Sequence, residues 1–174
     1  MMIDKKIVKA ARHAIESYFS KENFSLKDYN EKRGIFVTLY ENGELRGCIG
    51  FIEPVELNKG IIDAARSAAF GDPRFPPVSK NELTKIKIEV SILSVPELVK
   101  NIKEIKIGRD GLIIEGGWSK GLLLPQVFPE WNVKTTEDAL GMTCEKAGLS
   151  RDRWKDRKNV KIYKFQTEIF KENE

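Results

Sequence analysis

The sequence predicts an α+β fold in which antiparallel sheets pack against helices. The dipeptide Asn42-Gly43 separates two segments of alternating hydrophobicity, and this arrangement marks a two-residue hairpin turn. Residues 86–94 alternate in the same way, as expected of a further strand. Residues 4–19 and 57–70 instead carry apolar side chains at three- and four-residue spacing, which indicates amphipathic helices.

The first elements are a helix over Asp4–Phe19 and a hairpin over residues 34–51 that ends at Pro54. The turn sets the register, because it pairs Glu41 with Glu44. The pairs predicted on one face are Leu39 with Arg46, Val37 with Cys48 and Ile35 with Gly50. The pairs predicted on the other face are Tyr40 with Leu45, Thr38 with Gly47 and Phe36 with Ile49. Both faces are largely apolar, so we expect both to be covered.

A helix over Leu57–Phe70 follows, and Gly71 is placed to cap it. Its inner face is rich in alanine, which allows close packing on a sheet. After the loop GDPRFPPV, Ser79 and Glu82 form a capping box that predicts a short helix. The strand over Ile86–Ser94 completes this half of the chain.

The second half repeats the plan of hairpin, helix and strand. Its predicted elements are short strands at Lys106-Ile107 and Gly111–Glu115, a hairpin turning near Ser119-Lys120, a helix over Thr136–Ala147 capped by Gly148, and a strand over Val160–Phe170. We therefore expect one domain, residues 1–174, with two interlocked lobes that arose by duplication of units 34–95 and 105–170. Chance similarity between short apolar strands is the alternative explanation.

The composition restricts the class of protein. Hydrophobic residues make up 41% and charged residues 32%, which is typical of a globular chain with a substantial core. We expect no membrane span, no signal peptide and a cytoplasmic location, in which Cys48 and Cys144 are free thiols. The net charge of +4 is spread along the chain, which disfavours nucleic-acid binding. Abundant Lys, Glu and Ile resemble thermophile usage.

The strand ELRGCIGF contains the strongest candidate for a functional site. An arginine in a covered strand needs a partner, and for Arg46 this is a carboxylate, a row of backbone carbonyls or a bound anion. Gly47 and Gly50 indicate that something approaches the strand closely. In the loop GDPRFPPV, three prolines hold Arg74 and Phe75 on a stiff segment, as in many binding surfaces. The predicted ligand- or partner-binding residues are Arg46, Gly47, Cys48, Gly50, Asp72, Arg74 and Phe75.

Catalysis by this strand stays open, with Cys48 and Arg46 as the candidate catalytic residues. Arg46 would favour a Cys48 thiolate if the two side chains meet. The simpler alternative is that Cys48 is a small buried hydrophobe, and we expect Cys144 to be one as well. The only histidine, His13, lies on the N-terminal helix, and we expect it not to be catalytic.

Other chemistry finds little support in the sequence. One histidine and two separated cysteines do not make a standard zinc site, and no phosphate- or dinucleotide-binding motif occurs, so we expect no metal and no cofactor. Trp118 and Trp131 either line a cleft or pack in the core. The basic segment Ser150–Lys158 either contacts nucleic acid or is a solvated connection whose Trp154 folds back onto the core.

The motifs LRGCIGF, AAFGDPRFPPV, IKIEVSILS and GLLLPQV occur in this order and resemble the AMMECR-domain family, known in prokaryotes as AmmeMemoRadiSam system protein A. The resemblance covers nearly the whole chain. It departs from the family pattern at Asn132-Val133, where a second aromatic residue is expected.

The resemblance implies an α+β protein with a larger and a smaller lobe, and association with a Memo-like protein and a radical-SAM protein. It implies no established reaction. The leading hypothesis is therefore a ligand-binding or enzymatic protein, whose ligand is a small anion or peptide-like molecule bound by RGCIG and DPRF. The alternative is a non-catalytic protein-interaction module, and nucleic-acid binding is the least favoured.

Overall fold

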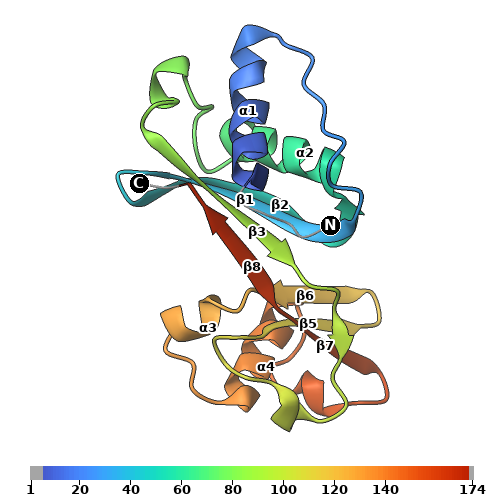
Figure 1. Cartoon of the computed structure of the whole chain (residues 1–174). Coiled ribbons are helices and arrows are strands. Elements are labelled where there is room, and N and C mark those ends of the chain that lie inside the picture. Colours follow the sequence, from blue (N-terminus) through green and yellow to red (C-terminus); the bar gives the residue numbers. More distant parts are fainter. Residues whose placement is uncertain (1–5, 173–174) are drawn as a thin grey trace. The chain divides into compact units, whose positions relative to one another are not determined.

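A computed structural model describes residues 6–172 and confirms the α+β class (Figure 1). The described chain divides into two compact units. The first contains residues 6–92 and 168–172, and the second contains residues 93–167. Each unit is built around a four-stranded sheet whose assigned strand pairs are antiparallel.

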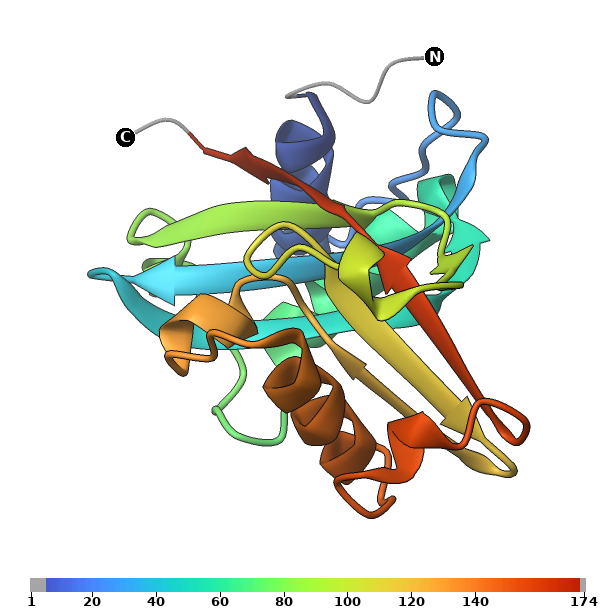
Figure 2. The same cartoon turned by 90° about the horizontal axis from the view of Figure 1, so that it is seen from below.

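The sheet of the first unit has the strand order β2-β1-β3-β8, which can be followed in Figure 2. Its elements are α1 (Lys6–Ser20), β1 (Lys32–Glu41), β2 (Glu44–Glu56), α2 (Leu57–Phe70), the 3₁₀ turn η1 (Lys80–Glu82), β3 (Ile86–Leu93) and β8 (Thr167–Lys171). Since β2 pairs with β1 alone among the described strands, it is an outer strand of this sheet.

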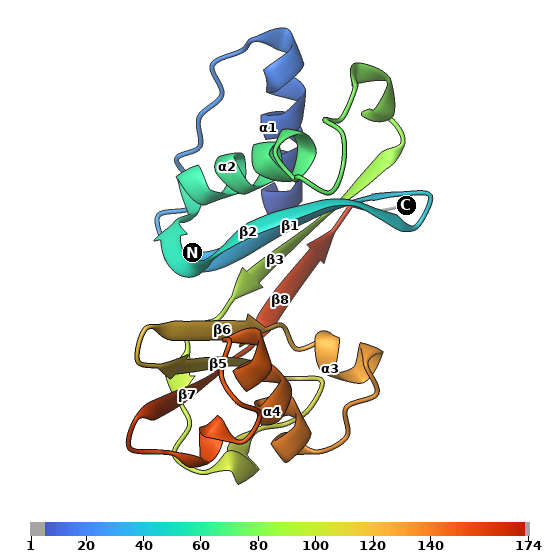
Figure 3. The same cartoon turned by 180° about the vertical axis from the view of Figure 1, so that it is seen from behind.

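Helices α1 and α2 cover one face of this sheet, as Figures 1 and 3 show. Ile35, Val37 and Leu39 alternate along β1 and are fully buried under the helices. The inner face of α2 is built of small residues, including Ala64, Ala65 and Ala68, which allows its backbone to lie close to β2.

The second unit has the strand order β4-β7-β5-β6. Its elements are β4 (Glu97–Leu98), η2 (Ile102–Glu104), β5 (Gly111–Gly116), β6 (Ser119–Leu123), α3 (Val127–Glu130), α4 (Thr136–Lys146), η3 (Arg153–Lys155) and β7 (Val160–Phe165). Helix α4 packs on β5 and β6 around a core that includes Phe128, Leu140 and Ile162. As in the first unit, the first strand of a hairpin pairs with a third strand that follows a helix.

Several local predictions are confirmed. Helix α2 has the predicted bounds, and the N–H of Gly71 caps it by donating to the carbonyl of Ser67. The capping box of Ser79 and Glu82 is present at η1. Helix α4 begins at Thr136 as predicted, and Gly148 follows it with a positive φ of 75°. Of the first predicted helix, Asp4 lies outside the described residues.

Other boundaries were wrong. The second hairpin turns at Gly117-Trp118, where Gly117 has a φ of 61°, and not at Ser119-Lys120. Lys106-Ile107 is not a strand, because this stretch enters a turn. The predicted strand Val160–Phe170 is two strands in different sheets, divided at Gln166.

Strand β2 also differs from the prediction near its end. It continues past Pro54 to Glu56. A shift in register between Arg33 and Ile35 leaves Pro54 in an irregular stretch, where its missing N–H breaks no regular ladder.

The predicted register of the first hairpin was wrong beyond its first two pairs. Glu41 pairs with Glu44 and Tyr40 with Leu45, but Leu39 then pairs with Gly47 and not with Arg46. The extra residue forms a β-bulge, a common irregularity of outer strands. As a result Cys48 pairs with Thr38, not with Val37.

None of the helices among residues 6–172 is long and apolar enough to cross a membrane.

Candidate functional site

The bulge in β2 places Arg46 against a carboxylate. Nε of Arg46 donates to Oε1 of Glu82 at 2.8 Å, and the two side chains are 11% and 22% exposed. The carboxylate belongs to η1, four residues beyond the GDPRFPPV loop. Nη1 of Arg46 is buried and has no hydrogen-bond partner among residues 6–172. Arg46 therefore links the outer strand to the segment that follows the loop.

Glu82 also closes the N-terminus of η1. Its Oε2 accepts from the backbone N–H of Ser79 at 2.7 Å. This bond, opposed by burial and supported by Arg46, lowers the pKa of Glu82 to about 2. The carboxylate is therefore ionised near neutral pH and is occupied by structural contacts.

Gly47 lies under helix α2. A Cβ atom at this position would lie 2.2 Å from the carbonyl oxygen of Ala68, so only glycine fits. The close approach predicted for Gly47 is thus an approach by the protein's own helix.

Gly50 is approached by the neighbouring strand. It pairs with Phe36, whose ring atoms would lie 2.5 Å from an added Cβ, and the carbonyl oxygen of Ile35 would lie at 2.2 Å. The ring of Phe36 therefore lies over the position that a side chain at residue 50 would occupy.

Cys48 is partly exposed and lies beside Thr38. The distance between Sγ of Cys48 and Oγ1 of Thr38 is 3.2 Å, within hydrogen-bonding range for sulfur. Thr38 also pairs with Glu89 of β3, and Glu89 forms an ion pair of 2.9 Å with Lys171 of β8. A row of polar side chains therefore crosses the four strands of the sheet.

Asp72 holds the GDPRFPPV loop on β2. Its carboxylate is 2% exposed, and Oδ2 accepts from the backbone N–H of Cys48 at 2.9 Å. Oδ1 accepts from the backbone N–H and from Nε of Arg74, and Oδ2 also accepts from Nη2 of Arg74 at 2.7 Å. The hydrogen bonds from Arg74, supported by that from Cys48, outweigh the effect of burial and hold the pKa of Asp72 well below its usual range.

Arg74 is held in one orientation while its side chain stays 55% exposed. Besides its bonds to Asp72, Nη2 donates to the carbonyl oxygen of Cys48 at 3.3 Å. Its guanidinium also lies 5.5 Å from the ring centre of Phe75. Nη1 has no hydrogen-bond partner within the described part of the chain, so it is available to a ligand.

The structure thus brings Cys48, Asp72, Arg74 and Phe75 together. Gly47 and Gly50 adjoin this group but are required by internal packing. Arg46 is directed to Glu82, and the bulge breaks the regular alternation that would place Arg46 on the same face as Cys48.

The remaining sequence candidates lie elsewhere. The ring centre of His13 on α1 lies 4.3 Å from that of Phe24, and its Nε2 lies 3.4 Å from a carboxylate oxygen of Glu22. Cys144 is fully buried in the core of the second unit, where burial raises the pKa of its thiol. Trp154 packs against the same core.

Of the other two tryptophans, Trp118 is fully exposed, whereas Trp131 lines a pocket of about 720 Å³ in the second unit with Met142 and Arg151. Arg151 is bound there by Asp138 and Glu145, each at 3.0 Å. Both terminal nitrogens of the guanidinium in this pocket are therefore bound by the protein's own carboxylates.

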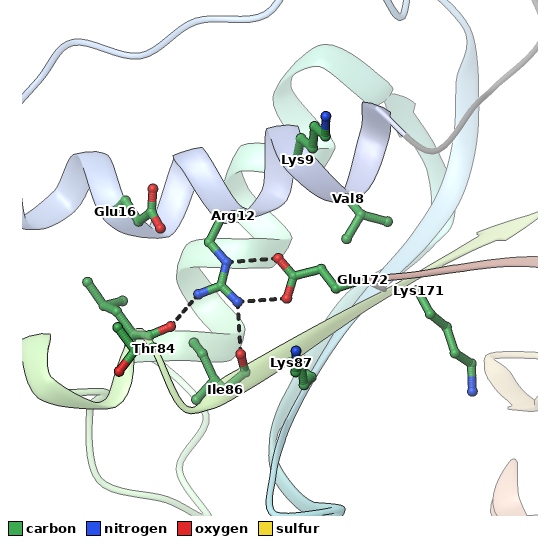
Figure 4. Close-up of a pocket in the computed structure, with 10 residues that line it drawn as sticks. Val8, Lys9, Arg12, Glu16, Thr84, Ile86, Lys87, Lys171 and Glu172 are labelled. Carbon is green, nitrogen blue, oxygen red and sulfur yellow. Dashed lines mark hydrogen bonds and ion pairs between the residues drawn. The ribbon is translucent and has the colours of Figure 1, made fainter. Parts of the chain in front are cut away.

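One polar pocket was missed by the sequence analysis (Figure 4). It has a volume of about 550 Å³, and Arg12 of α1 lies in it with a bidentate ion pair to Glu172 at 2.9 and 2.6 Å. Arg12 also donates to the carbonyl oxygens of Leu83 and Ile86. Arg12 and Glu172 are 160 residues apart in the sequence, so no local sequence pattern indicates that they form an ion pair.

Across residues 6–172, no group of three or more His, Cys, Asp and Glu side chains is arranged to hold a metal ion.

The chain was compared with known proteins. The AMMECR1 family model matches residues 8–170. A protein of Methanocella arvoryzae is 51% identical over 96% of this chain and 89% of its own length, and a protein of Methanothermobacter thermautotrophicus is 47% identical over 96% and 93%. The crystal structure of the uncharacterized protein PH0010 from Pyrococcus horikoshii matches with a TM-score of 0.83 and 45% identity, over 97% of this chain and 91% of that one.

Proposed function

The chain belongs to the AMMECR1 family, and on this premise we propose that it is a binding protein whose ligand presents an anionic group to Arg74 beside Cys48. The observation that carries the proposal is the geometry of Arg74. A buried carboxylate fixes its Nε and Nη2, its side chain is 55% exposed, and its Nη1 is available. An arginine held in this way is preorganised to bind a carboxylate or phosphate.

Binding is favoured over catalysis because Cys48 lacks an activating base. Within the described residues, the hydrogen-bond partner of its sulfur is the hydroxyl of Thr38, at 3.2 Å. A hydroxyl is a poor general base, and a nucleophilic cysteine needs a base or a lowered pKa. His13 belongs to α1, which covers the face of the sheet occupied by Val37 and Leu39, whereas Cys48 lies on the other face with Thr38.

The proposal also includes a cytoplasmic location and, by family resemblance, a Memo-like or radical-SAM protein as the source of the anionic group. A protein-interaction role and a ligand-binding role coincide if that group belongs to a polypeptide.

The reactivity of Cys48 provides a direct test. Cys144 is fully buried, so thiol reagents added to the folded protein report mainly on Cys48. We expect Arg74 to accelerate the reaction of Cys48 with the dianionic reagent dithiobis(nitrobenzoate), relative to its reaction with the neutral reagent dithiodipyridine. Attraction between close charges near a protein surface is about 0.5–1.5 kcal/mol, which corresponds to a rate ratio of about two to thirteen at low salt.

A single and a double variant distinguish the effect of the Arg74 charge on these rates from the effect of the Asp72 charge. Arg74→Gln leaves Asp72 unpaired and negative, so the double variant Asp72→Asn with Arg74→Gln serves as the neutral reference. Arg109→Gln is the matched control, because Arg109 binds the adjacent buried Asp110 in the same way but belongs to the second unit. Equal rate ratios in the wild type and the double variant would refute anion attraction by Arg74.

A further inference from the structure

The outer edge of β2 is partly open. Among residues 6–172, β2 is the longest strand, with 13 residues, and β1 is its only strand neighbour. An outer strand presents backbone N–H and C=O groups that a further strand is able to bind. Leu45 and Ile52 on this strand are 41% and 37% exposed.

The side chains of the loop already occupy one position of this edge. Asp72 accepts the N–H of Cys48, and Arg74 donates to its C=O, at 2.9 and 3.3 Å. These two groups therefore point away from β1. Because outward and inward groups alternate along a regularly paired strand, the N–H and C=O of Gly50 face the same outer edge, and so does the N–H of Ile52, which follows the last regular pair at Phe51.

The open stretch is bounded at both ends. The bulge at Arg46 and the cap formed by Asp72 and Arg74 on Cys48 close one end. Pro54 and the irregular pairing around it close the other. Gly50 and the N–H of Ile52 remain between these boundaries, beyond the Cys48 carbonyl group that Arg74 binds.

We propose that an extended C-terminal peptide adds to this edge as a strand antiparallel to β2, with its terminal carboxylate on Arg74. This inference rests on the proposed function, since it names the anionic group as a peptide carboxylate. The antiparallel direction follows from the position of Arg74, which lies at the Cys48 end of the open stretch. The terminal residue then lies opposite Gly50, directly beyond the cap on Cys48, and the residue two positions before it lies opposite Ile52.

The surface around Gly50 adds a side-chain preference. Gly50 has no side chain, and the ring of Phe36 lies against it. A peptide side chain opposite Gly50 therefore meets an aromatic ring, so we expect an apolar or aromatic residue at the C-terminal position.

The first test is a display library of random heptapeptides with free C-termini, selected in parallel on the wild type and on Arg74→Gln. The wild type is expected to enrich peptides with an apolar or aromatic C-terminal residue, and Arg74→Gln is expected not to. The absence of enrichment above the Arg74→Gln background would overturn the proposal.

An enriched peptide is then synthesised with a free acid, with a C-terminal amide, and with single N-methyl groups at successive residues. We expect the amide, and Arg74→Gln with the acid, each to weaken binding at least about tenfold. Strand addition requires every second N-methyl group to weaken binding about tenfold, while the alternate positions have little effect. The variant Ile52→Pro removes an outward N–H without breaking the ladder to β1, and it is expected to weaken binding with little change in melting temperature.

The outcomes separate the two proposals. Loss of binding with the amide and with Arg74→Gln, but no alternation among the N-methyl peptides, would overturn strand addition and leave anion binding standing. Alternation without dependence on the carboxylate or on Arg74 would overturn the assignment of the carboxylate to Arg74.

Discussion

Replacing Asp72 with asparagine tests whether one buried carboxylate holds the loop on β2. The two side chains have nearly the same shape. An asparagine that keeps its oxygen at the position of Oδ1 places its amide nitrogen where Oδ2 now accepts from the N–H of Cys48 and from Nη2 of Arg74. Two donors then face a third donor, and both hydrogen bonds are lost.

The expected cost follows from these contacts. A hydrogen bond to a charged group contributes about 1.5–3 kcal/mol, and the two lost bonds are not additive because they share one carboxylate. We expect Asp72→Asn to lower the free energy of unfolding by about 3 kcal/mol. For a chain of this length that corresponds to a decrease in melting temperature of about 6–12 °C.

The pH dependence identifies the carboxylate as the cause. Because the pKa of Asp72 is lowered in the folded state, its contribution is fully present above its ordinary pKa of 3.8 and is lost as the pH falls below that value. At pH 3 the stability difference between wild type and Asp72→Asn is expected to shrink by about 1 kcal/mol. This follows because pH 3 lies 0.8 pH units below the ordinary pKa of 3.8, and each pH unit corresponds to about 1.36 kcal/mol.

Urea unfolding at pH 7 and pH 3 measures both quantities, with exposed Asp63→Asn as a control expected to change stability by less than about 0.5 kcal/mol. A difference below about 1 kcal/mol at pH 7, or one that does not shrink at pH 3, would show that the loop is held by other contacts.

Three further predictions concern neighbouring positions. Gly47→Ala is expected to destabilise the protein by about 2–3 kcal/mol in thermal or urea unfolding, because its Cβ would meet the carbonyl oxygen of Ala68 at 2.2 Å; an unchanged melting temperature would contradict the close approach of α2. Removing the ion pair with Glu82 by Arg46→Met should cost about 1–2 kcal/mol at pH 7 and less as the pH falls from 4.5 toward 2, where Glu82 protonates; a pH-independent cost would count against the pair. Replacing His13 with alanine removes a ring contact and should cost about 1 kcal/mol in urea unfolding, while leaving the ratio of thiol-reagent rates at Cys48 unchanged; a changed ratio would place His13 near the site.

Local patterns in the sequence predicted the elements that local forces determine. Helix α2, the capping box at Ser79 and the Asn42-Gly43 turn depend on residues within a few positions of one another. The bulge at Arg46 could not be predicted in this way, because the alternation of β2 reads the same with or without one extra residue. The resulting shift by one position placed Gly47 opposite Thr38 in the prediction, where the structure has Cys48.

The sequence predicted which segments form the candidate site better than it predicted the contacts between them. The stiff loop and the glycines drew attention to the right segments, and the structure joins them through the carboxylate of Asp72. Sequence reasoning did not anticipate that this carboxylate binds the edge of β2, because a backbone N–H leaves no mark in the sequence. Duplication of the two units stays a prediction, although each unit has a hairpin, a helix and a third strand in the same order.

The last strand has a consequence for synthesis. β8 borders β3 in the first sheet, yet more than seventy residues lie between the ends of the two strands in sequence. At about 5–20 residues per second, a ribosome takes about 4–15 s to make the intervening chain. During that interval the outer edge of β3 has no partner strand, and Arg12 has not yet met Glu172. A nascent chain arrested before residue 167 would therefore expose a strand edge that is prone to pair with other chains.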